Sequence, residues 1–370
     1  MLSVFSSPGH YVQGRDATAA LGPEMRRLGL AGPVLIVAAP SAERLLADTW
    51  RATFNDVGTD YGVHRFGGEC SRAEIRRISE AARNAGAGVV VGAGGGKALD
   101  AARAAADDLA LPFVSCPTAA SNDAPCSALS VVYSEAGEFE AYQLVARNPA
   151  LVLVDSSAVV RAPARLFSAG MGDALATWYE ARTCVAGHVK NMRGGASTRS
   201  AAALAELCHR TLLADGPAAL SAVRQQLLTP AVERLIEANT LLSGLGFESS
   251  GLAAAHAVHN GLTAAPQTHE FLHGEKVAFG VLTQLVLEGA PDTELDQVLE
   301  FCCAVGLPVT LGGLGLAGID RALVRTIAER TVAPGETVHN EPFAVDAAMV
   351  ADALLAADGL GREFSPASRG

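Results

Sequence analysis

The sequence predicts an α/β domain with a mostly parallel sheet, followed by an all-helical domain. Short runs of aliphatic residues alternate with helical patterns in the first part of the chain, whereas only helical patterns occur from about Ala164 onward. The length of 370 residues also favours two domains, because one hydrophobic core rarely supports so long a chain. We place the domains at residues 1–162 and 163–370, because Pro163 follows the last strand-like run.

The first domain should alternate strands and helices along the chain. Its strands are expected at residues 34–37, 88–91, 112–116 and 151–155, and its helices at 71–84 and 97–107. The helix at 71–84 has the clearest start, because Ser71 and Glu74 have the spacing of a capping box. Strands that alternate with helices imply a parallel sheet with helices on both faces.

The second domain is rich in alanine and leucine at helical spacing. Helices are expected at residues 173–186, 198–213, 230–242, 252–262 and 275–287. The end of the chain, residues 365–370, is expected to be a disordered tail.

The composition excludes several classes of protein. The formal net charge of −11 opposes binding to a phosphate backbone, so nucleic acid is not an expected partner. No apolar run is long enough to cross a bilayer, and the N-terminus lacks the basic start of a signal peptide, so we expect a cytoplasmic protein without a membrane partner. The seven cysteines include no CxxC pair, which argues against a disulfide framework and against a cysteine zinc site.

A glycine-rich segment at residues 88–100 has the order strand, glycine turn, helix, and reads GVVVGAGGGKALD. The turn would lie at a helix N-terminus, where backbone N–H groups and the helix dipole attract an anion. Glycine lets the backbone approach a pyrophosphate, and Lys97 adds a positive charge. The spacing is neither GxGxxG nor that of a P-loop, so a plain glycine-rich turn is an equally good interpretation of this segment alone.

Six segments along the chain carry a family pattern. They read GAGGGKALDAARA, CPTAASNDAPCSALSVVYSEAGEFEAY, AGMGDALATWYEARTC, AAHAVHNGLTA, HGEKVAFGVLTQLVLE and GETVHNEPF. Together they resemble the glycerol dehydrogenases of the iron-containing alcohol dehydrogenase superfamily, in the family order and over nearly the whole chain. The resemblance implies a dehydroquinate-synthase-like fold, in which a dinucleotide-binding α/β domain is followed by a helical metal-binding domain.

The resemblance also implies a binding site for NAD in the first domain. The residues at the matching cofactor positions are Gly94, Gly95, Gly96, Lys97, Asp100, Thr118, Ser121, Ser127, Leu129 and Tyr133. The first four would hold the pyrophosphate, the next three would lie beside the phosphates and ribose, and the last three would line the nicotinamide site. Ordinary strand packing is the alternative interpretation for Leu129 and Tyr133.

A metal site in the second domain is implied by the match of Asp173, His256 and His273 to the family's ligands. One carboxylate and two imidazoles suit zinc, and a catalytic site with three protein ligands keeps a position open for substrate. A bound cation would stabilise the alkoxide of an alcohol while its hydride passes to the nicotinamide. Iron-dependent relatives carry a further histidine four residues after the aspartate, where this chain has Thr177, so Zn2+ is the expected ion.

Two further histidines lie near this set in the sequence. His259 comes three residues after His256 and therefore on the same helix face. We assign His259 to substrate contact or to the support of a metal ligand, with a partly buried structural histidine as the plainer alternative. His269 is expected in a loop near the entrance of the site.

The sequence departs from the family at the cofactor and on the substrate side. No acidic residue follows the strand that ends at Val37 until Glu43, so NADP use is expected beside NAD. Asp123 matches a residue that contacts the hydroxyl groups of glycerol, although its context, SNDAP, would also suit a simple surface turn. Asn122 replaces a common threonine, and the loop at 265–272 is one residue shorter than usual, which puts glycerol itself in question as the natural substrate.

The expected function is zinc-dependent hydride transfer between a nicotinamide cofactor and a secondary hydroxyl of glycerol or a related polyol, with glycerol converted to dihydroxyacetone. The alternative substrates are a different vicinal diol, a hydroxyketone or a cyclitol. A dehydroquinate-synthase-like lyase would share the fold, but the region from Asp173 to Lys276 has few basic residues for a substrate phosphate. A non-catalytic binding protein would not need an intact metal set. The ring assemblies of the family imply a homo-oligomer.

Overall fold

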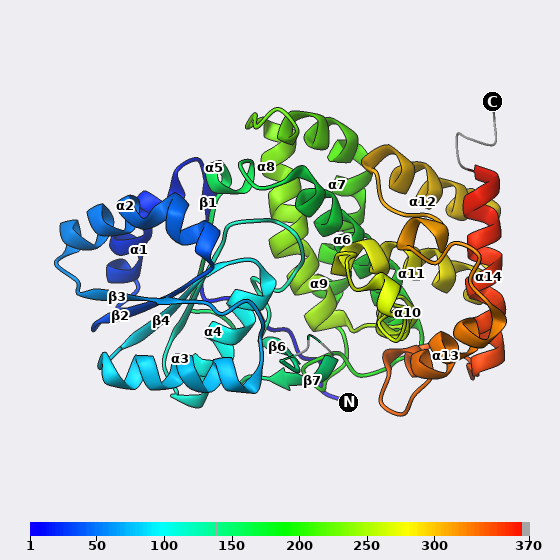
Figure 1. Ribbon diagram of the computed structural model, residues 1–370, viewed down its shortest axis with the longest axis horizontal. Helices are drawn as coiled ribbons and strands as arrows, with labels where there is room; N and C mark the ends of the chain where they lie inside the picture. Colours follow the sequence, from blue (N-terminus) through cyan, green and yellow to red (C-terminus); the bar gives the residue numbers. More distant parts are fainter. Residues whose placement is uncertain (136, 138, 365–370) are drawn as a thin grey trace. The chain divides into compact units, whose positions relative to one another are not determined.

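The structure is a computed structural model that describes residues 1–135, 137 and 139–364 (Figure 1), so the tail expected at 365–370 lies outside it. The chain divides into two compact units. The α/β unit comprises Ser6–Ala164 and Ala222–Gly244, and the helical unit comprises Met1–Phe5, Arg165–Ser221 and Leu245–Gly370. The expected boundary after residue 162 lies close to the transition at Ala164. Two short segments depart from the expected division, because Met1–Phe5 belongs to the helical unit and Ala222–Gly244 to the α/β unit.

Six parallel strands form the sheet of the α/β unit, which confirms the predicted fold class. The strands are β1 (Tyr11–Gly14), β2 (Val34–Ala38), β3 (Tyr61–Arg65), β4 (Val89–Gly94), β5 (Phe113–Pro117) and β8 (Leu151–Asp155). Their order across the sheet is β1-β8-β5-β4-β2-β3, and every neighbouring pair is parallel. The chain leaves β2 for the edge strand β3 and returns to β4 on the other side of β2. A topological switch point, where α/β sheets bind ligands, therefore lies between β2 and β4.

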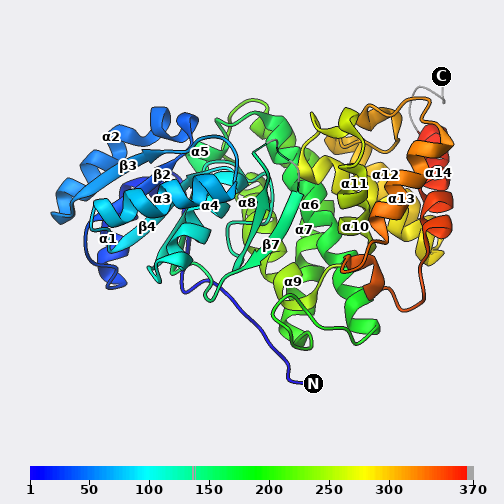
Figure 2. The same ribbon diagram turned by 60° about the horizontal axis from the view of Figure 1, so that its bottom comes forward.

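Helices cover both faces of this sheet, as Figures 1 and 2 show. They are α1 (Leu21–Arg27), α2 (Pro40–Val57), α3 (Arg72–Asn84) and α4 (Gly96–Asp108). On one face Trp50 of α2 belongs to a buried cluster with Ile36 of β2. On the other face Leu35 of β2 packs in a cluster with residues of α3 and α4. Neighbouring residues of β2 serve opposite clusters because successive side chains of a strand point to opposite faces.

The start of α3 follows the prediction only in part. Ser71 caps the helix, since its side chain accepts a hydrogen bond of 3.2 Å from the backbone N–H of Glu74. Glu74 does not complete a capping box, because its Oε1 accepts from the backbone N–H of Gly67.

Several elements of the α/β unit were not predicted. They are β1, β3, α1, α2, β6 (Leu129–Tyr133), β7 (Phe139–Leu144), α5 (Ser156–Val159) and the 3-10 helix η1 (Ala17–Ala20). The helix expected at 230–242 is present as α8 (Pro230–Glu237) followed by the π-helix η2 (Ala238–Leu242). β6 and β7 form an antiparallel pair. The helix expected at 230–242 therefore ends in a π-helical turn, and it belongs to the α/β unit instead of the second domain. Polar contacts hold it there, because Gln13 donates to Glu233 and the hydroxyls of Tyr11 and Thr240 lie 2.9 Å apart.

Helices make up most of the second unit, as predicted. The α-helices are α6 (Ala164–Ala186), α7 (Arg199–Val223), α9 (Ser243–Ser250), α10 (Ala254–Leu262), α11 (His273–Glu288), α12 (Asp292–Val305), α13 (Arg321–Thr331) and α14 (Ala347–Phe364). Short 3-10 turns lie at η3 (Pro266–Thr268), η4 (Gly312–Leu314) and η5 (Thr337–Asn340). The last three α-helices were not predicted; α14 packs against α11 and α13.

The expected helix start at residue 173 is wrong, because α6 begins nine residues earlier, at Ala164. Gly170 and Gly172 suggested a break in the chain, but both are helical. A side-chain carbon on Gly172 would lie 2.3 Å from the carbonyl oxygen of Gly274 in α11, so this glycine serves close helix packing. Among the described residues, no helix is long and apolar enough to cross a membrane.

Candidate metal centre and cofactor loop

Three side chains of the helical unit form a candidate metal centre. Asp173 comes from the middle of α6, His256 from the first turn of α10 and His273 from the first residue of α11. One ligand atom from each lies within 4.8 Å of the other two. The Nε2 atoms of the histidines point at the same carboxylate oxygen, with His273 at 3.1 Å and His256 at 3.4 Å from Asp173 Oδ1. Residues far apart in sequence thus place two imidazole nitrogens and one carboxylate around one point.

Two glycines beside these residues bring α6 and α11 into backbone contact. Gly172 precedes Asp173, and Gly274 follows His273. A side-chain carbon on Gly274 would lie 1.8 Å from the carbonyl oxygen of Ala169 and 3.0 Å from the backbone nitrogen of Asp173. The absence of side chains at both positions therefore sets the separation of the helices that carry Asp173 and His273.

The electrostatics of the site follow from burial and from the charges around it. Burial alone would raise the pKa of the Asp173 carboxyl, but the two imidazoles outweigh it and hold that pKa well below its usual range. Burial alone would lower the pKa of His256, but Glu180 and Asp173 raise it well above the ordinary value. The centre is therefore an anionic pocket that favours a positive charge.

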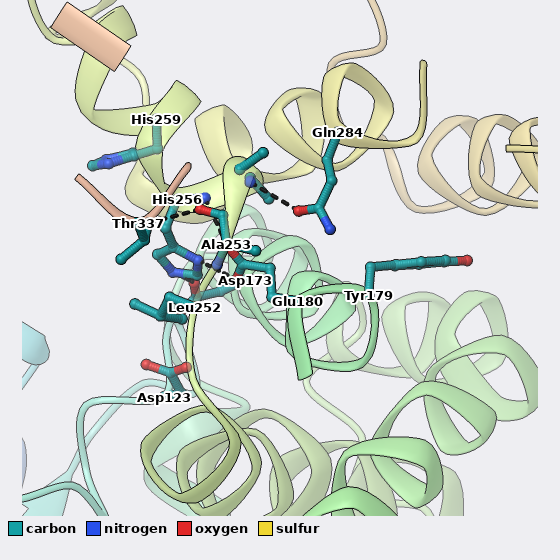
Figure 3. A network of polar contacts seen from close by, with 12 residues as sticks. Asp123, Asp173, Tyr179, Glu180, Leu252, Ala253, His256, His259, Gln284 and Thr337 are labelled. Atoms are coloured by element: carbon teal, nitrogen blue, oxygen red, sulfur yellow. Dashed lines mark hydrogen bonds and ion pairs between the residues drawn. The ribbon is translucent and has the colours of Figure 1, made fainter. Parts of the chain in front are cut away.

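A carboxylate that was not predicted from the sequence lies behind His256. Glu180 is completely buried, and its Oε2 lies 2.6 Å from His256 Nδ1 (Figure 3). Glu180 comes seven residues after Asp173, which places both on the same face of α6. That spacing is the signal in the sequence that could have identified it.

His259 lies behind His273 and not in the ligand cluster. Its Nε2 is 3.0 Å from His273 Nδ1, and its Nδ1 is 3.0 Å from Asn260 Oδ1. Burial, together with the neighbouring His273, lowers the pKa of His259 well below the ordinary value, so this imidazole is neutral near pH 7. His269 is exposed and lies 3.0 Å from the carbonyl oxygen of Thr263.

The donor set fits a divalent cation. Two imidazole nitrogens and a carboxylate are ligands that zinc accepts, and three ligands leave a coordination position for a further oxygen. The second nitrogen of each histidine already has a partner in the protein, as metal-binding histidines usually do. Thr177, the position at which the resemblance implied a further histidine in iron-dependent relatives, is buried in α6 and offers no imidazole.

The glycine loop of the α/β unit lies at the switch point of the sheet, between the end of β4 and the start of α4. Gly94 has a φ of 154°, and a side-chain carbon there would lie 2.8 Å from Ala39 Cβ. Gly96 faces Asn122, whose Nδ2 would be 2.3 Å from a side-chain carbon. Gly95, by contrast, has ordinary backbone angles, and a side-chain carbon there would meet no described protein atom within 4 Å. The described protein atoms therefore do not require glycine at position 95. A pyrophosphate bound at the helix N-terminus would require it, because a side chain there would obstruct the approach of the phosphate to the backbone.

Lys97 and Asp100 follow the loop and have different surroundings. Lys97 is half-exposed, pairs with Glu69 at 2.6 Å and lies over the ring of Tyr133. Asp100 is buried; its Oδ1 pairs with Arg103 at 2.6 Å and its Oδ2 accepts from the backbone N–H of Val131. Arg103 was not predicted to take part in the site. It also donates to two backbone carbonyls and so joins α4 to the segment around Asp123.

The other predicted cofactor and substrate residues lie after β5. Thr118 donates its backbone N–H to Gly94, so its chain runs directly beside the glycine loop. Ser121 is partly exposed, whereas Ser127 and Leu129 are buried. Asp123 accepts a hydrogen bond of 3.1 Å from Ser243 and is also nearly buried, so it is not a simple surface turn residue.

The end of β2 is apolar where an acidic residue would meet the adenosine ribose. Ala38 ends the strand and Ala39 caps α2, whose first turn carries Glu43. The register of β2 and β3 pairs Ala38 with Arg65, an exposed residue at the end of the edge strand. The residue paired with this strand end is therefore an arginine.

Comparisons with family models, with curated proteins and with solved structures all point to the same family. The family described as iron-containing alcohol dehydrogenase matches residues 8–156. A glycerol dehydrogenase of Pseudomonas putida is 50% identical over 97% of this chain and 98% of its own length. A glycolaldehyde reductase of Halobacterium salinarum is 48% identical over 98% of this chain and 99% of its own length. The crystal structure of glycerol dehydrogenase from Schizosaccharomyces pombe superposes with a TM-score of 0.94 at 35% identity, over 98% of this chain and 92% of that one.

Proposed function

Because the chain belongs to the glycerol dehydrogenases of the iron-containing alcohol dehydrogenase family, we propose that it is a zinc-dependent, nicotinamide-linked dehydrogenase of glycerol or a closely related polyol. The observation that carries the proposal is the convergence of Asp173, His256 and His273 on one point of the helical unit. No one of these residues would suffice as evidence, since each could be a buried structural residue. Their common geometry supports a metal site of the kind that alcohol oxidation needs.

In the proposed mechanism, the three residues would hold a divalent cation, which would supply positive charge to a substrate oxygen. Asp173 neutralises part of that charge, and the two histidines offer Nε2 lone pairs. The neutral His259 lies directly behind His273, and we propose that it supports this ligand and does not itself bind the metal. A bound oxidised nicotinamide would accept the hydride from the alcohol carbon and solvent would accept the hydroxyl proton, which together convert a secondary alcohol to a ketone.

We propose that the glycine loop binds the cofactor through its backbone. Gly94, Gly95 and Gly96 would approach the pyrophosphate at the N-terminus of α4, with Lys97 beside it. Asp100 would act on the cofactor indirectly, because Arg103 and the backbone of Val131 already engage its carboxylate.

The cofactor preference that we propose includes NADP as well as NAD. An acidic residue after the second strand of such domains binds the ribose hydroxyls and repels a 2′-phosphate. Ala38 and Ala39 occupy that place here, and Arg65 ends the neighbouring strand. A guanidinium suits a phosphate group, so the strand ends favour a phosphorylated ribose.

The substrate residue in this proposal is Asp123, whose carboxylate would bind a hydroxyl next to the reacting carbon. The high identity to a glycolaldehyde reductase supports a second candidate, the reduction of a small hydroxyaldehyde or hydroxyketone. Asn122, which packs against Gly96, is the departure from the family that bears on this choice. Both candidates use the same metal and cofactor residues.

The test is an assay of absorbance at the wavelength of the reduced cofactor, with zinc-loaded protein. Glycerol, 1,2-propanediol and cyclic polyols are offered with NAD or NADP, and glycolaldehyde and dihydroxyacetone with the reduced cofactors. We expect turnover of a vicinal diol or its carbonyl partner with at least one cofactor. The absence of net oxidation or reduction across the whole panel would refute the proposal.

A further inference from the structure

The N-terminus of α10 is capped entirely by side chains from other elements. The cap residue, Ala253, has no side-chain acceptor, so the first backbone N–H groups of the helix need partners elsewhere. Those of Ala253 and His256 donate to Glu180, that of Ala254 to Glu341 and that of Ala255 to Gln284, at 2.8 to 3.1 Å. Figure 3 shows Glu180 and Gln284 at the end of this helix. The turn that carries His256 is therefore held by buried carboxylate and amide groups.

Glu180 makes contacts of two kinds with this turn. Its Oε1 accepts the backbone N–H groups of Ala253 and His256, while its Oε2 lies 2.6 Å from His256 Nδ1. A carboxylate can only accept hydrogen bonds, so His256 must carry a proton on Nδ1. When His256 is neutral, its Nε2 is then left with a lone pair, and this is the atom directed at Asp173.

A longer chain of hydrogen bonds has the same consequence for His273. Asn260 Nδ2 donates to Glu336, so Asn260 Oδ1 faces the Nδ1 atom of His259 as an acceptor. His259 therefore carries its proton on Nδ1, and its Nε2 accepts from His273 Nδ1. His273 is left with its lone pair on Nε2, 3.1 Å from Asp173.

We propose that Glu180 is a positioning residue, which fixes His256 in the one tautomer and orientation that can bind a divalent cation through Nε2. Glu336 does the same for His273 through Asn260 and His259. Neutral imidazole binds a metal through an unprotonated nitrogen, and a hydrogen bond at the other nitrogen decides which one is free. This inference rests on the proposed metal site, but it concerns residues that do not touch the ion.

The conservative substitution Glu180→Gln puts this role to the test. Glutamine keeps the length of the side chain but replaces one acceptor oxygen with an N–H2 donor. If that group faces His256 Nδ1, the imidazole must carry its proton on Nε2, and if it faces the backbone, two N–H groups lose their acceptor. The matched control is Glu341→Gln, because Glu341 caps the same helix end by accepting the Ala254 N–H, and an oxygen of glutamine can accept that hydrogen bond equally well.

The measurement is the zinc affinity of metal-stripped protein, determined by competition with a chromophoric chelator, with the thermal unfolding of each metal-free variant in parallel. We expect the Kd for zinc to rise about 10- to 100-fold in Glu180→Gln and to change less than about threefold in Glu341→Gln. An unchanged Kd in Glu180→Gln, or an equal rise in both variants, would overturn the inference. Lower stability with unchanged Kd would also overturn it, since Glu180 would then be only a helix cap.

A second variant covers the case in which Glu180→Gln does not fold. Glu180→Asp keeps the charge but withdraws the carboxylate by one methylene group from His256, and we expect a similar loss of zinc affinity. Wild-type affinity in Glu180→Asp would refute the positioning role. If the unmodified protein itself binds no zinc, the proposed function fails, which is a different result from a failure of the positioning role alone.

Discussion

The substitution Gly274→Ala tests how closely the metal centre depends on helix packing. The new carbon would lie 1.8 Å from the carbonyl oxygen of Ala169, whereas side-chain carbons essentially never come nearer than 3.0 Å. The difference, 3.0 − 1.8 = 1.2 Å, is the least separation that α6 and α11 must gain. Both contacting groups are backbone, so no side chain can rotate away to relieve the overlap.

Two effects of this separation can be estimated. Overpacking of a well-packed interior costs about 1–3 kcal/mol, against which alanine recovers up to ~1 kcal/mol through its helix propensity. We expect the free energy of unfolding of the metal-free protein to fall by roughly 2 kcal/mol. His273 and Asp173 flank the overlap, so a shift of this size exceeds the few tenths of an ångström that metal–ligand distances tolerate. Zinc affinity should fall at least ~10-fold.

The assay combines urea unfolding of metal-free protein with zinc titration. Gly359→Ala is the matched control, since Gly359 lies in α14 and a side-chain carbon there would meet nothing within 4 Å. The control should keep wild-type zinc affinity and gain up to ~1 kcal/mol of stability. Wild-type affinity and stability in Gly274→Ala would refute the claim that the glycine contact sets the ligand geometry.

Substrate contact, cofactor choice and the pH dependence of stability can each be tested by substitution. Asp123→Ala should raise the KM for a vicinal diol about 10- to 100-fold, as expected for loss of a hydrogen bond to a charged group. The KM for a simple secondary alcohol should rise far less. An equal rise in KM for both substrates would show that Asp123 does not contact the second hydroxyl. Ala39→Asp and Arg65→Ala should each lower kcat/KM with NADP at least ~10-fold relative to NAD, and unchanged ratios would show that other groups select the cofactor. Burial and the nearby Glu288 raise the pKa of Glu341 to about 8, so the folded protein binds a proton that the unfolded chain has lost above its ordinary pKa of 4.5. The stabilisation from this proton should be fully present below pH 4.5 and should fall towards pH 8 by up to roughly 1.4 kcal/mol per pH unit. In Glu341→Gln, the free energy of unfolding measured with a chemical denaturant should depend less steeply on pH. Parallel pH curves for the variant and the unmodified protein would contradict this.

The fold class could be predicted from the sequence, because the apolar residues of strands and helices recur at characteristic spacings. The run LVLVD, for example, became β8 at the predicted residues. The pattern failed where polar contacts decide the outcome. The helix at 230–242 reads as part of a helical domain, yet hydrogen bonds from Gln13 and Tyr11 attach it to the sheet. No local periodicity contains that information.

The candidate site shows the same division between local and long-range information. The resemblance placed Asp173, His256 and His273 in one site, and the structure brings their donor atoms together. It did not indicate Glu180, whose spacing of seven residues from Asp173 puts it on the same face of α6 but does not show that it contacts His256, because that contact depends on how α6 and α10 pack. The helix start expected at residue 173 came from the local glycine pattern and was wrong, because Gly172 is a contact point within a continuous helix. Asp100 was grouped with the cofactor residues, whereas its pairing with Arg103 depends on burial that a sequence does not reveal.

The proposed metal site is tested most directly by the metal content of three purified proteins that are stripped with a strong chelator and then supplied with zinc. We expect close to one zinc per chain in the unmodified protein, loss of activity on chelation and its return with zinc. His256→Ala should retain neither zinc nor turnover, whereas His259→Ala should retain zinc at saturating concentration with reduced activity. A metal site formed by Asp173, His256 and His273 would be contradicted if the active protein contained no divalent metal, or if His259→Ala emptied the site while His256→Ala did not.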